Sequence, residues 1–150
     1  MTASGEKIES TFLTQRQVEI LSLRGEGLTQ ETIANRLGTS VPNISSIEQS
    51  ARRNIEKAER TVALARVLRS QVSFTAEAGT DLRNLVDTIY RRGDETDTRV
   101  DYTDPELSAH LHDQLEAHIE GRQLTTDIEI GLTADGDVLL FPVTGAAAER

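Results

Sequence analysis

Apolar and polar positions follow a helical period between residues 28 and 51, where the chain reads LTQETIANRLGTSVPNISSIEQSA. The first apolar stripe ends at Leu37 and is followed at once by Gly38, which can adopt the positive φ that closes a helix. A second apolar stripe starts at Ile44, behind polar capping residues. This pattern predicts a helix-turn-helix whose second helix covers about residues 40–51.

Capping residues mark the helix starts on both sides of this turn. Thr29 precedes the first helix of the pair, and Pro42 lies in the first turn of the second, where a missing amide proton costs nothing. Further upstream, Thr14 and Gln17 have the spacing of a capping box, which predicts a preceding helix that ends at Gly25. We expect this helix to brace the pair from behind.

The second helix of the pair is predicted to continue well beyond the turn. No Gly or Pro occurs between Pro42 and Gly79, and apolar residues recur in steps of three and four at Ile44, Ile47, Ala51, Ile55, Ala58, Val62 and Ala65. The pattern predicts a helix of about 28 residues, on the order of 42 Å long, with a heptad-like apolar seam. We expect the seam to pack on its own chain or on a second copy.

Residues 71–144 change character and predict a small domain with the order β-α-β-α-β-β. Strands are expected at 71–77, 98–102, 124–132 and 138–143, and helices at 81–92 and from Thr103 or Asp104, with Pro105 in first position, to Gly121. An acidic loop is expected at 93–97 and a hairpin turn at 134–137. The last strand is fully apolar, so we expect it to be central in the sheet.

The predicted fold class is therefore α+β. An all-α helix-turn-helix domain with an extended third helix is expected at residues 12–70, before the α/β domain. The start, residues 1–11, is polar and small and is expected to be disordered, and the tail at 145–150 is expected to be frayed. A chain of 150 residues accommodates two small domains of this kind.

Charge is distributed unevenly between the two halves. Residues 1–70 carry ten Lys or Arg and eight Asp or Glu, whereas residues 71–150 carry six and seventeen. The first half can therefore lie on a polyanion, which would repel the second half. Only two of the sixteen basic residues are lysine. That composition is typical of proteins from salt-loving archaea, which explains much of the acidic excess.

The outward face of the second helix is short, polar and nearly uncharged, which suits the base edges of a DNA major groove. The residues expected to contact bases are Val41, Asn43, Ser45, Ser46 and Gln49. Those expected to contact phosphates are Thr29, Gln30, Thr39, Ser40, Arg52 and Arg53. The alternative interpretation of the same stretch is an ordinary helical hairpin.

The segment from Phe12 to Ala58 resembles the archaeal Tfx family of DNA-binding proteins. The blocks that carry the resemblance are LTQRQ, GLTQETIANRLGTS and ARRNIEKA. The opening blocks are also similar to response-regulator output domains and to sigma-factor region 4, whereas generic helix-turn-helix proteins do not share the last block. The C-terminal half resembles the family more loosely. The resemblance implies a transcription regulator with an N-terminal reading head and a C-terminal α/β domain.

Catalysis, metal binding and membrane insertion find little support in the sequence. His110 and His112 lie two residues apart on a predicted helix, so their side chains point about 200° apart and cannot share one ion. Ser45 and Ser46 have no activating base nearby, and no Gly-rich loop follows a strand. The chain has no cysteine and lacks the apolar runs of membrane helices and signal peptides. We therefore expect a cytoplasmic protein with no enzymatic activity, cofactor or metal.

The sequence as a whole predicts a sequence-specific DNA-binding transcription regulator. A homodimer on double-stranded DNA is expected, because a single motif of this size buries too little DNA surface for tight binding. Two alternatives stay open. In one, the motif contacts another protein of the transcription machinery. In the other, the acidic half is an effector-binding domain to which a DNA-binding head is attached. The sequence leaves open whether the C-terminal domain binds a small-molecule effector, contacts the transcription machinery or forms the dimer, and whether the long helix forms the dimer instead.

Overall fold

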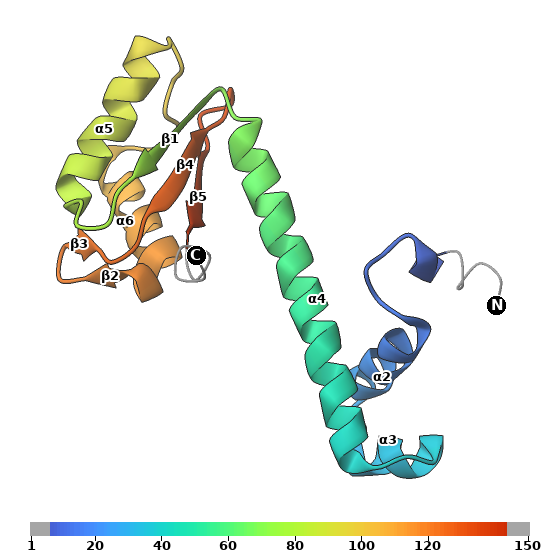
Figure 1. The fold of residues 1–150 in the computed structure, drawn as a ribbon. Helices are drawn as coiled ribbons and strands as arrows, with labels where there is room; N and C mark the ends of the chain where they lie inside the picture. The colour runs from blue at the N-terminus through green and yellow to red at the C-terminus, as the bar shows by residue number, and fades with distance from the viewer. Residues whose placement is uncertain (1–6, 144–150) are drawn as a thin grey trace. The chain divides into compact units, whose positions relative to one another are not determined.

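The computed structural model describes residues 7–143. The chain divides into two compact units, Met1–Thr61 and Val62–Arg150. The boundary between the units falls within helix α4 (Val41–Leu68), so this helix contributes residues to both (Figure 1). Each unit has its own hydrophobic core.

The two ends of the chain fall outside the described residues. The disorder predicted for residues 1–6 and the frayed tail at 145–150 therefore stay predictions. Residues 7–9, which belong to the segment expected to be disordered, form a helical turn. The amide of Thr11 donates to the carbonyl of Ile8 (2.9 Å) at the end of this turn.

The first unit contains α2 (Gln15–Gly25), α3 (Gln30–Leu37) and the first part of α4 (Figure 1). The predicted capping box is present, because Thr14 Oγ1 accepts from the Gln17 amide and Gln17 Oε1 accepts from the Thr14 amide. The core consists of the buried residues Ile20, Ile33, Ala34 and Ile44, with Leu23, Leu28, Leu37 and Ile47 packed around them. Because Ile20 lies on α2, this helix braces the other two as predicted.

The turn between α3 and α4 is predicted correctly. Gly38 has a φ of 70° and ends α3 in the left-handed conformation. Thr29 caps α3 by accepting the amide of Thr32 (3.1 Å), and Ser40 Oγ accepts the amide of Asn43 in the first turn of α4 (3.2 Å). These local hydrogen bonds satisfy backbone donors at the two helix starts and so fix where each helix begins.

Helix α4 has the predicted length of 28 residues. Its apolar seam is covered in part by its own chain. Ile44 and Ala51 are fully buried, whereas Ile55 is 37% exposed and Val62 is 60% exposed. The seam therefore leaves apolar side chains in contact with solvent along the helix beyond Ala51.

The second unit contains a three-stranded antiparallel sheet in the order β1 (Val72–Ala76), β4 (Ile128–Leu132), β5 (Val138–Pro142). Helices α5 (Leu82–Glu95) and α6 (Asp104–Leu115) cover one face of this sheet (Figure 1). The largest side chains buried between the helices and the sheet are Leu85, Ile89, Leu107, Leu111, Leu115, Ile128, Ile130 and Leu132. Within each helix these residues recur every four residues, which is why the pattern predicts both helices.

The last turns of α4 pack on the opposite face of the sheet, at Gly131. Its strand neighbours Ile130 and Leu132 point into the core, so Gly131 faces the other side. A Cβ at this position would overlap with Ser70 Oγ and lie 3.1 Å from the Cα of Val67. Only glycine therefore allows α4 to approach the strand this closely.

Two predictions between α5 and α6 are wrong. Residues 98–102 do not form a strand. Their alternation arises because Val100 and Tyr102 pack on the core while their neighbours face solvent. A segment that is not paired with the sheet can show the same alternation. The acidic loop expected at 93–97 is also incorrect in its first part, because α5 continues to Glu95. A Cβ at Gly93 would lie 2.7 Å from the Thr98 carbonyl, so glycine permits the chain to return tightly along the helix.

The segment after α6 also differs from the prediction. Thr103 caps α6, which places Pro105 second rather than first in the helix, and the helix ends at Leu115 rather than at Gly121. A 3₁₀ turn, η1 (Glu116–His118), and a hairpin of β2 (Ile119–Glu120) and β3 (Gln123–Leu124) follow. Gly121 has a φ of 66° and forms the hairpin turn. The strand predicted at 124–132 is consequently split into β3 and β4.

The apolar strand β5 lies at an edge of the sheet and β4 is central, which corrects the expectation for the last strand. The hairpin between them is present as predicted, with Gly136 at a φ of 89°. Leu139, on the face away from the core, lines a small cavity together with Ala63 and Val67 of α4. Both faces of β5 are therefore covered although one of its edges is open, which explains its continuous apolar run.

Candidate DNA-binding surface

The N-terminal part of α4, the second helix of the motif, presents polar side chains to solvent. Four of the five residues predicted to contact bases are exposed, namely Val41, Asn43, Ser46 and Gln49, and Ser45 is half-buried. Ser46, Gln49 and the exposed Arg53 lie three and four residues apart, so they share one face of the helix. We call these three residues the polar face of α4. Contact of this face with DNA stays a prediction.

Two hydroxyl groups lie at the start of α4 beside Asn43. Thr39 Oγ1 accepts a hydrogen bond from Asn43 Nδ2 (2.9 Å), and Ser40 Oγ accepts from the Asn43 amide (3.2 Å). Both hydroxyls act as acceptors in these bonds, so each keeps its own proton for donation to a phosphate oxygen. Their position at a helix N-terminus also favours an anion.

The other two uncharged candidates for phosphate contact are engaged within the fold. Thr29 Oγ1 donates to Thr32 Oγ1 (2.9 Å) in addition to capping α3. Gln30 Nε2 donates to Glu48 Oε1 (2.9 Å). Thr29 would therefore have to exchange a partner before donating to DNA, whereas Gln30 retains a second amide proton.

Glu48 is a residue of this surface that the sequence pattern did not predict. Its side chain is nearly fully buried and receives hydrogen bonds from Arg24 on α2, Gln30 on α3 and Arg52 on α4. Arg24 Nε lies 3.2 Å from Glu48 Oε2, and Arg24 Nη1 donates to the Leu28 carbonyl (3.0 Å). A signal was present in the sequence, because Glu48 follows Ile44 by four residues and so places a charge on the inward stripe of α4.

The carboxyl group of Glu48 is ionised throughout the range in which proteins are usually folded. Burial raises its pKa, but the hydrogen bonds from Gln30 and the two arginines outweigh burial, and the pKa falls to about 2. The buried carboxylate is thus paired with donors from all three helices of the motif.

The two arginines predicted to contact phosphates have different surroundings. Nε and Nη2 of Arg52 donate to Glu48 Oε2 (3.1 and 2.5 Å), and the Arg52 side chain remains 61% exposed. Arg53 is exposed, and none of the ion pairs found among residues 7–143 includes it. The structure therefore supplies one arginine held in place at the surface and one that extends into solvent.

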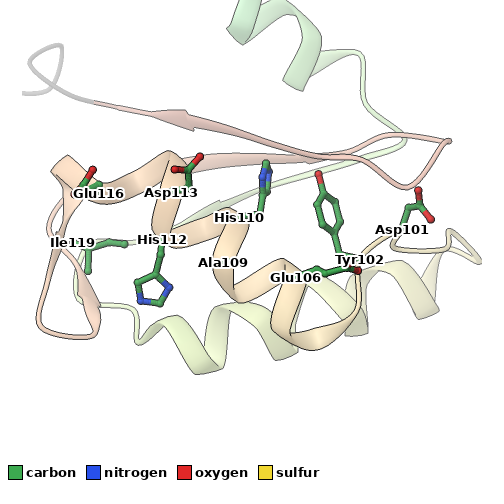
Figure 2. A pocket seen from close by; sticks show the side chains of 9 residues that line it. All are labelled: Asp101, Tyr102, Glu106, Ala109, His110, His112, Asp113, Glu116 and Ile119. Atoms are coloured by element: carbon green, nitrogen blue, oxygen red, sulfur yellow. The ribbon is translucent and has the colours of Figure 1, made fainter.

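The second unit carries an open groove along α6, with a volume of about 1020 Å³. Figure 2 shows the side chains that line it, which are Asp101, Tyr102, Glu106, Ala109, His110, His112, Asp113, Glu116 and Ile119. The Tyr102 and His110 rings stack with their centroids 4.9 Å apart. Burial, with the hydrogen bond to Asp137 (2.6 Å), raises the pKa of Tyr102 to about 12.

The histidines of this groove point in different directions. His110 and His112 leave α6 on opposite sides (Figure 2). His110 Nε2 lies 2.9 Å from the Val138 carbonyl, whereas His112 Nδ1 lies 2.8 Å from the Ser108 carbonyl of its own helix. Within residues 7–143, no three His, Asp or Glu side chains gather closely enough to hold a metal ion. Nor does any helix in this range have the length and apolar character needed to cross a membrane.

Comparisons with known proteins divide the chain in a similar way. Residues 12–57 match the model of sigma-70 region 4, and residues 58–140 match the family described as DNA-binding protein, TFX, C-terminal. The chain is 39% identical over its whole length to a candidate transcriptional regulatory protein of the salt-loving archaeon Haloarcula marismortui, and covers 92% of that protein. Over 88% of its length it is 30% identical to the DNA-binding protein Tfx of Methanothermobacter marburgensis, and it covers 96% of that relative.

The three-helix arrangement of the first unit and these matches together define the class of protein, a helix-turn-helix transcription regulator. More specifically, the chain belongs to the Tfx family of DNA-binding proteins. The resemblance noted for residues 12–58 is thereby confirmed, and the family extends through the second unit, where the sequence resembled it more loosely.

Proposed function

We propose that the protein is a sequence-specific regulator whose residues 40–51 enter the major groove of double-stranded DNA. The observation that carries this proposal is the polar face of α4. Its exposed Ser46 and Gln49 side chains lie on the second helix of a helix-turn-helix, next to an arginine that extends into solvent. The matches to the Tfx family and to sigma-70 region 4 support the same assignment.

Within this proposal, the residues divide into two groups by chemistry. Gln49 and Asn43 have amide groups that can pair with adenine, the Ser45 and Ser46 hydroxyls can reach several base acceptors, and Val41 can contact a thymine methyl group. Phosphates are contacted by the hydroxyls at the start of α4 and by Arg52 and Arg53, with Thr29 and Gln30 at the start of α3. Base contacts set the sequence preference, and phosphate contacts set the orientation of the protein.

The protein acts as a homodimer in this proposal. A single helix-turn-helix covers little DNA, and two-fold symmetric pairs on repeated half-sites are the usual solution. The exposed apolar side chains of Ile55 and Val62 on α4 support this step, because burying them in a second copy removes apolar surface from water.

A second candidate function concerns the groove along α6. It contains a Tyr–His ring stack and several carboxylates, and these groups could stack on and hydrogen-bond to a small-molecule effector. A ligand screen followed through the NMR signals of Tyr102 and His110 tests this. Ligand-dependent shifts at both rings are expected, and shifts confined to other parts of the chain would count against the groove.

The DNA-binding proposal is tested by selecting a binding sequence from a random duplex pool and footprinting the protein on it. We expect one enriched sequence with two protected half-sites about one helical turn apart, or a multiple of that spacing. Protection without an enriched sequence would indicate nonspecific binding. A single protected site would contradict the dimer.

A further inference from the structure

Glu48 is a buried carboxylate that lies directly beneath two side chains of the candidate DNA-binding surface. It is 4% exposed and sits four residues before Arg52 on α4. Its two oxygens face different helices. Oε1 accepts from Gln30 Nε2 on α3 (2.9 Å), and Oε2 accepts from Arg52 on α4. One carboxylate therefore connects the two helices whose exposed ends are expected to meet the DNA backbone.

The geometry leaves part of each partner available for an outside ligand. Arg52 uses Nε and Nη2 on Glu48, which turns Nη1 away from the carboxylate, and its side chain is 61% exposed. Gln30 uses one of its two amide protons. Arg24 on α2 donates a hydrogen bond to the Glu48 carboxylate and another to the Leu28 carbonyl. Glu48 thus fixes the directions of both surface side chains while itself remaining out of reach of DNA.

We propose that Glu48 is a positioning residue for DNA binding, which orders Arg52 and Gln30 to receive phosphates of the DNA backbone. This inference rests on the proposed function. With Glu48 present, the Arg52 and Gln30 side chains are ordered before DNA binds. Without Glu48 they would be ordered only when the complex forms, and the lost conformational freedom of each side chain would weaken binding by a few-fold. We expect a combined effect of about tenfold on Kd.

Simple electrostatics makes the opposite prediction, which allows a sharp test. Replacing Glu48 by Gln removes one negative charge next to two arginines, so the surface becomes more positive. If Glu48 had no positioning role, this change would tighten binding to DNA. If Glu48 holds Arg52 in place, the change weakens binding despite the added positive charge.

The experiment measures fluorescence anisotropy on the duplex that the wild-type protein enriches from a random pool, across a salt series. E48Q is compared with E56Q, which removes the same charge from an exposed position of the same helix. We expect E48Q to raise Kd about tenfold and to flatten the salt slope by about one, as a lost phosphate contact would. E56Q should bind at least as tightly as wild type.

Arg52→Ala separates positioning from a general loss of stability. If Glu48 acts through Arg52 and Gln30, the double variant E48Q/R52A should bind only slightly less tightly than R52A alone. Arg52→Lys provides a variant at an exposed position that keeps the charge but cannot form the two-point contact with Glu48. We expect R52K to lose most of the affinity that R52A loses.

The outcomes are distinguishable. If the wild-type protein binds the duplex and folded E48Q binds it equally or more tightly, the positioning role is overturned and the DNA-binding proposal stands. If E48Q does not fold, R52K decides, and wild-type affinity in R52K would overturn the inference. Failure of the wild-type protein to bind any duplex would overturn both proposals together.

Discussion

The carboxylate of Glu48 should make the stability of the protein sensitive to acid. Its pKa is lowered in the folded state from an ordinary value of 4.5 to about 2, so folding favours the ionised form. The corresponding stabilisation is present above the unfolded-state value and disappears as the pH falls through about 2. A lowering of this size corresponds to about 3 kcal/mol at neutral pH. The Glu48 side chain is 6% exposed but its partner Arg52 is 61% exposed, so solvent screens part of the attraction and about 3 kcal/mol is an upper bound.

The prediction is checked by urea unfolding of wild type and E48Q, followed by circular dichroism, at several pH values. The difference in free energy of unfolding between the two proteins should be largest near pH 6 and should shrink by up to about 3 kcal/mol toward pH 2, because the Glu48 carboxylate of the wild type then becomes protonated. Other carboxylates titrate in both proteins and cancel in the difference. An equal difference at pH 6 and pH 2 would show that the ionised carboxylate does not stabilise this motif.

Three further predictions concern the turn, the polar face and the seam. Gly38→Ala should destabilise the protein by about 1 to 2 kcal/mol, because an alanine side chain is strained at a φ of 70°. Gly25→Ala, at a helical position with open space around it, should stabilise it by about 0.4 to 1 kcal/mol. Urea unfolding measures the change in free energy of unfolding in both variants. Equal changes would show that the left-handed conformation of Gly38 does not disfavour alanine. Gln49→Ala should relax the preference at one base position by about 1 to 3 kcal/mol, measured by binding to single-base variants of the selected duplex. An unchanged preference would exclude that contact. If the proposed dimer forms through the seam of α4, Val62→Glu should dissociate it in sedimentation velocity, because the substitution would bury a charge there. A dimer that persists in the variant would place the interface elsewhere in the chain.

Local signals in the sequence were sufficient for the first unit. The capping box at Thr14, the left-handed turn at Gly38 and the uninterrupted stretch after Pro42 each depend on residues within one or two turns. Such features specify helix starts and ends without reference to the rest of the fold. The three helices of the motif were therefore predicted with nearly correct bounds.

The errors in the second unit involve contacts between distant parts of the chain. The alternation at 98–102 predicts a strand, but alternation records only which side chains face the core. Whether a segment also lies beside a strand of the sheet depends on the tertiary fold, which periodicity does not encode. Gly121 follows a helical apolar repeat and so predicts a helix end, but it forms a hairpin turn. The position of β5 at the edge also depends on the long-range pairing of β1 with β4.

The site was predicted as a set of exposed side chains, without the group beneath them. Polar residues on the outer face of α4 follow from helical spacing, so Ser46 and Gln49 could be placed from the sequence. The hydrogen bonding of the buried Glu48 includes Arg24, which precedes it by 24 residues and reaches it from another helix. A charge on an otherwise apolar stripe was the one local sign of such a network.

Sequence-specific reading of DNA by the polar face of α4 can be tested by fluorescence anisotropy of the wild-type protein on its selected duplex and on random duplex, across a salt series. We predict a preference of about a thousandfold or more for the selected duplex, together with a steep decline of affinity as salt increases. Equal affinity for both duplexes would contradict sequence-specific reading, and no binding at any salt concentration would contradict the DNA-binding function itself.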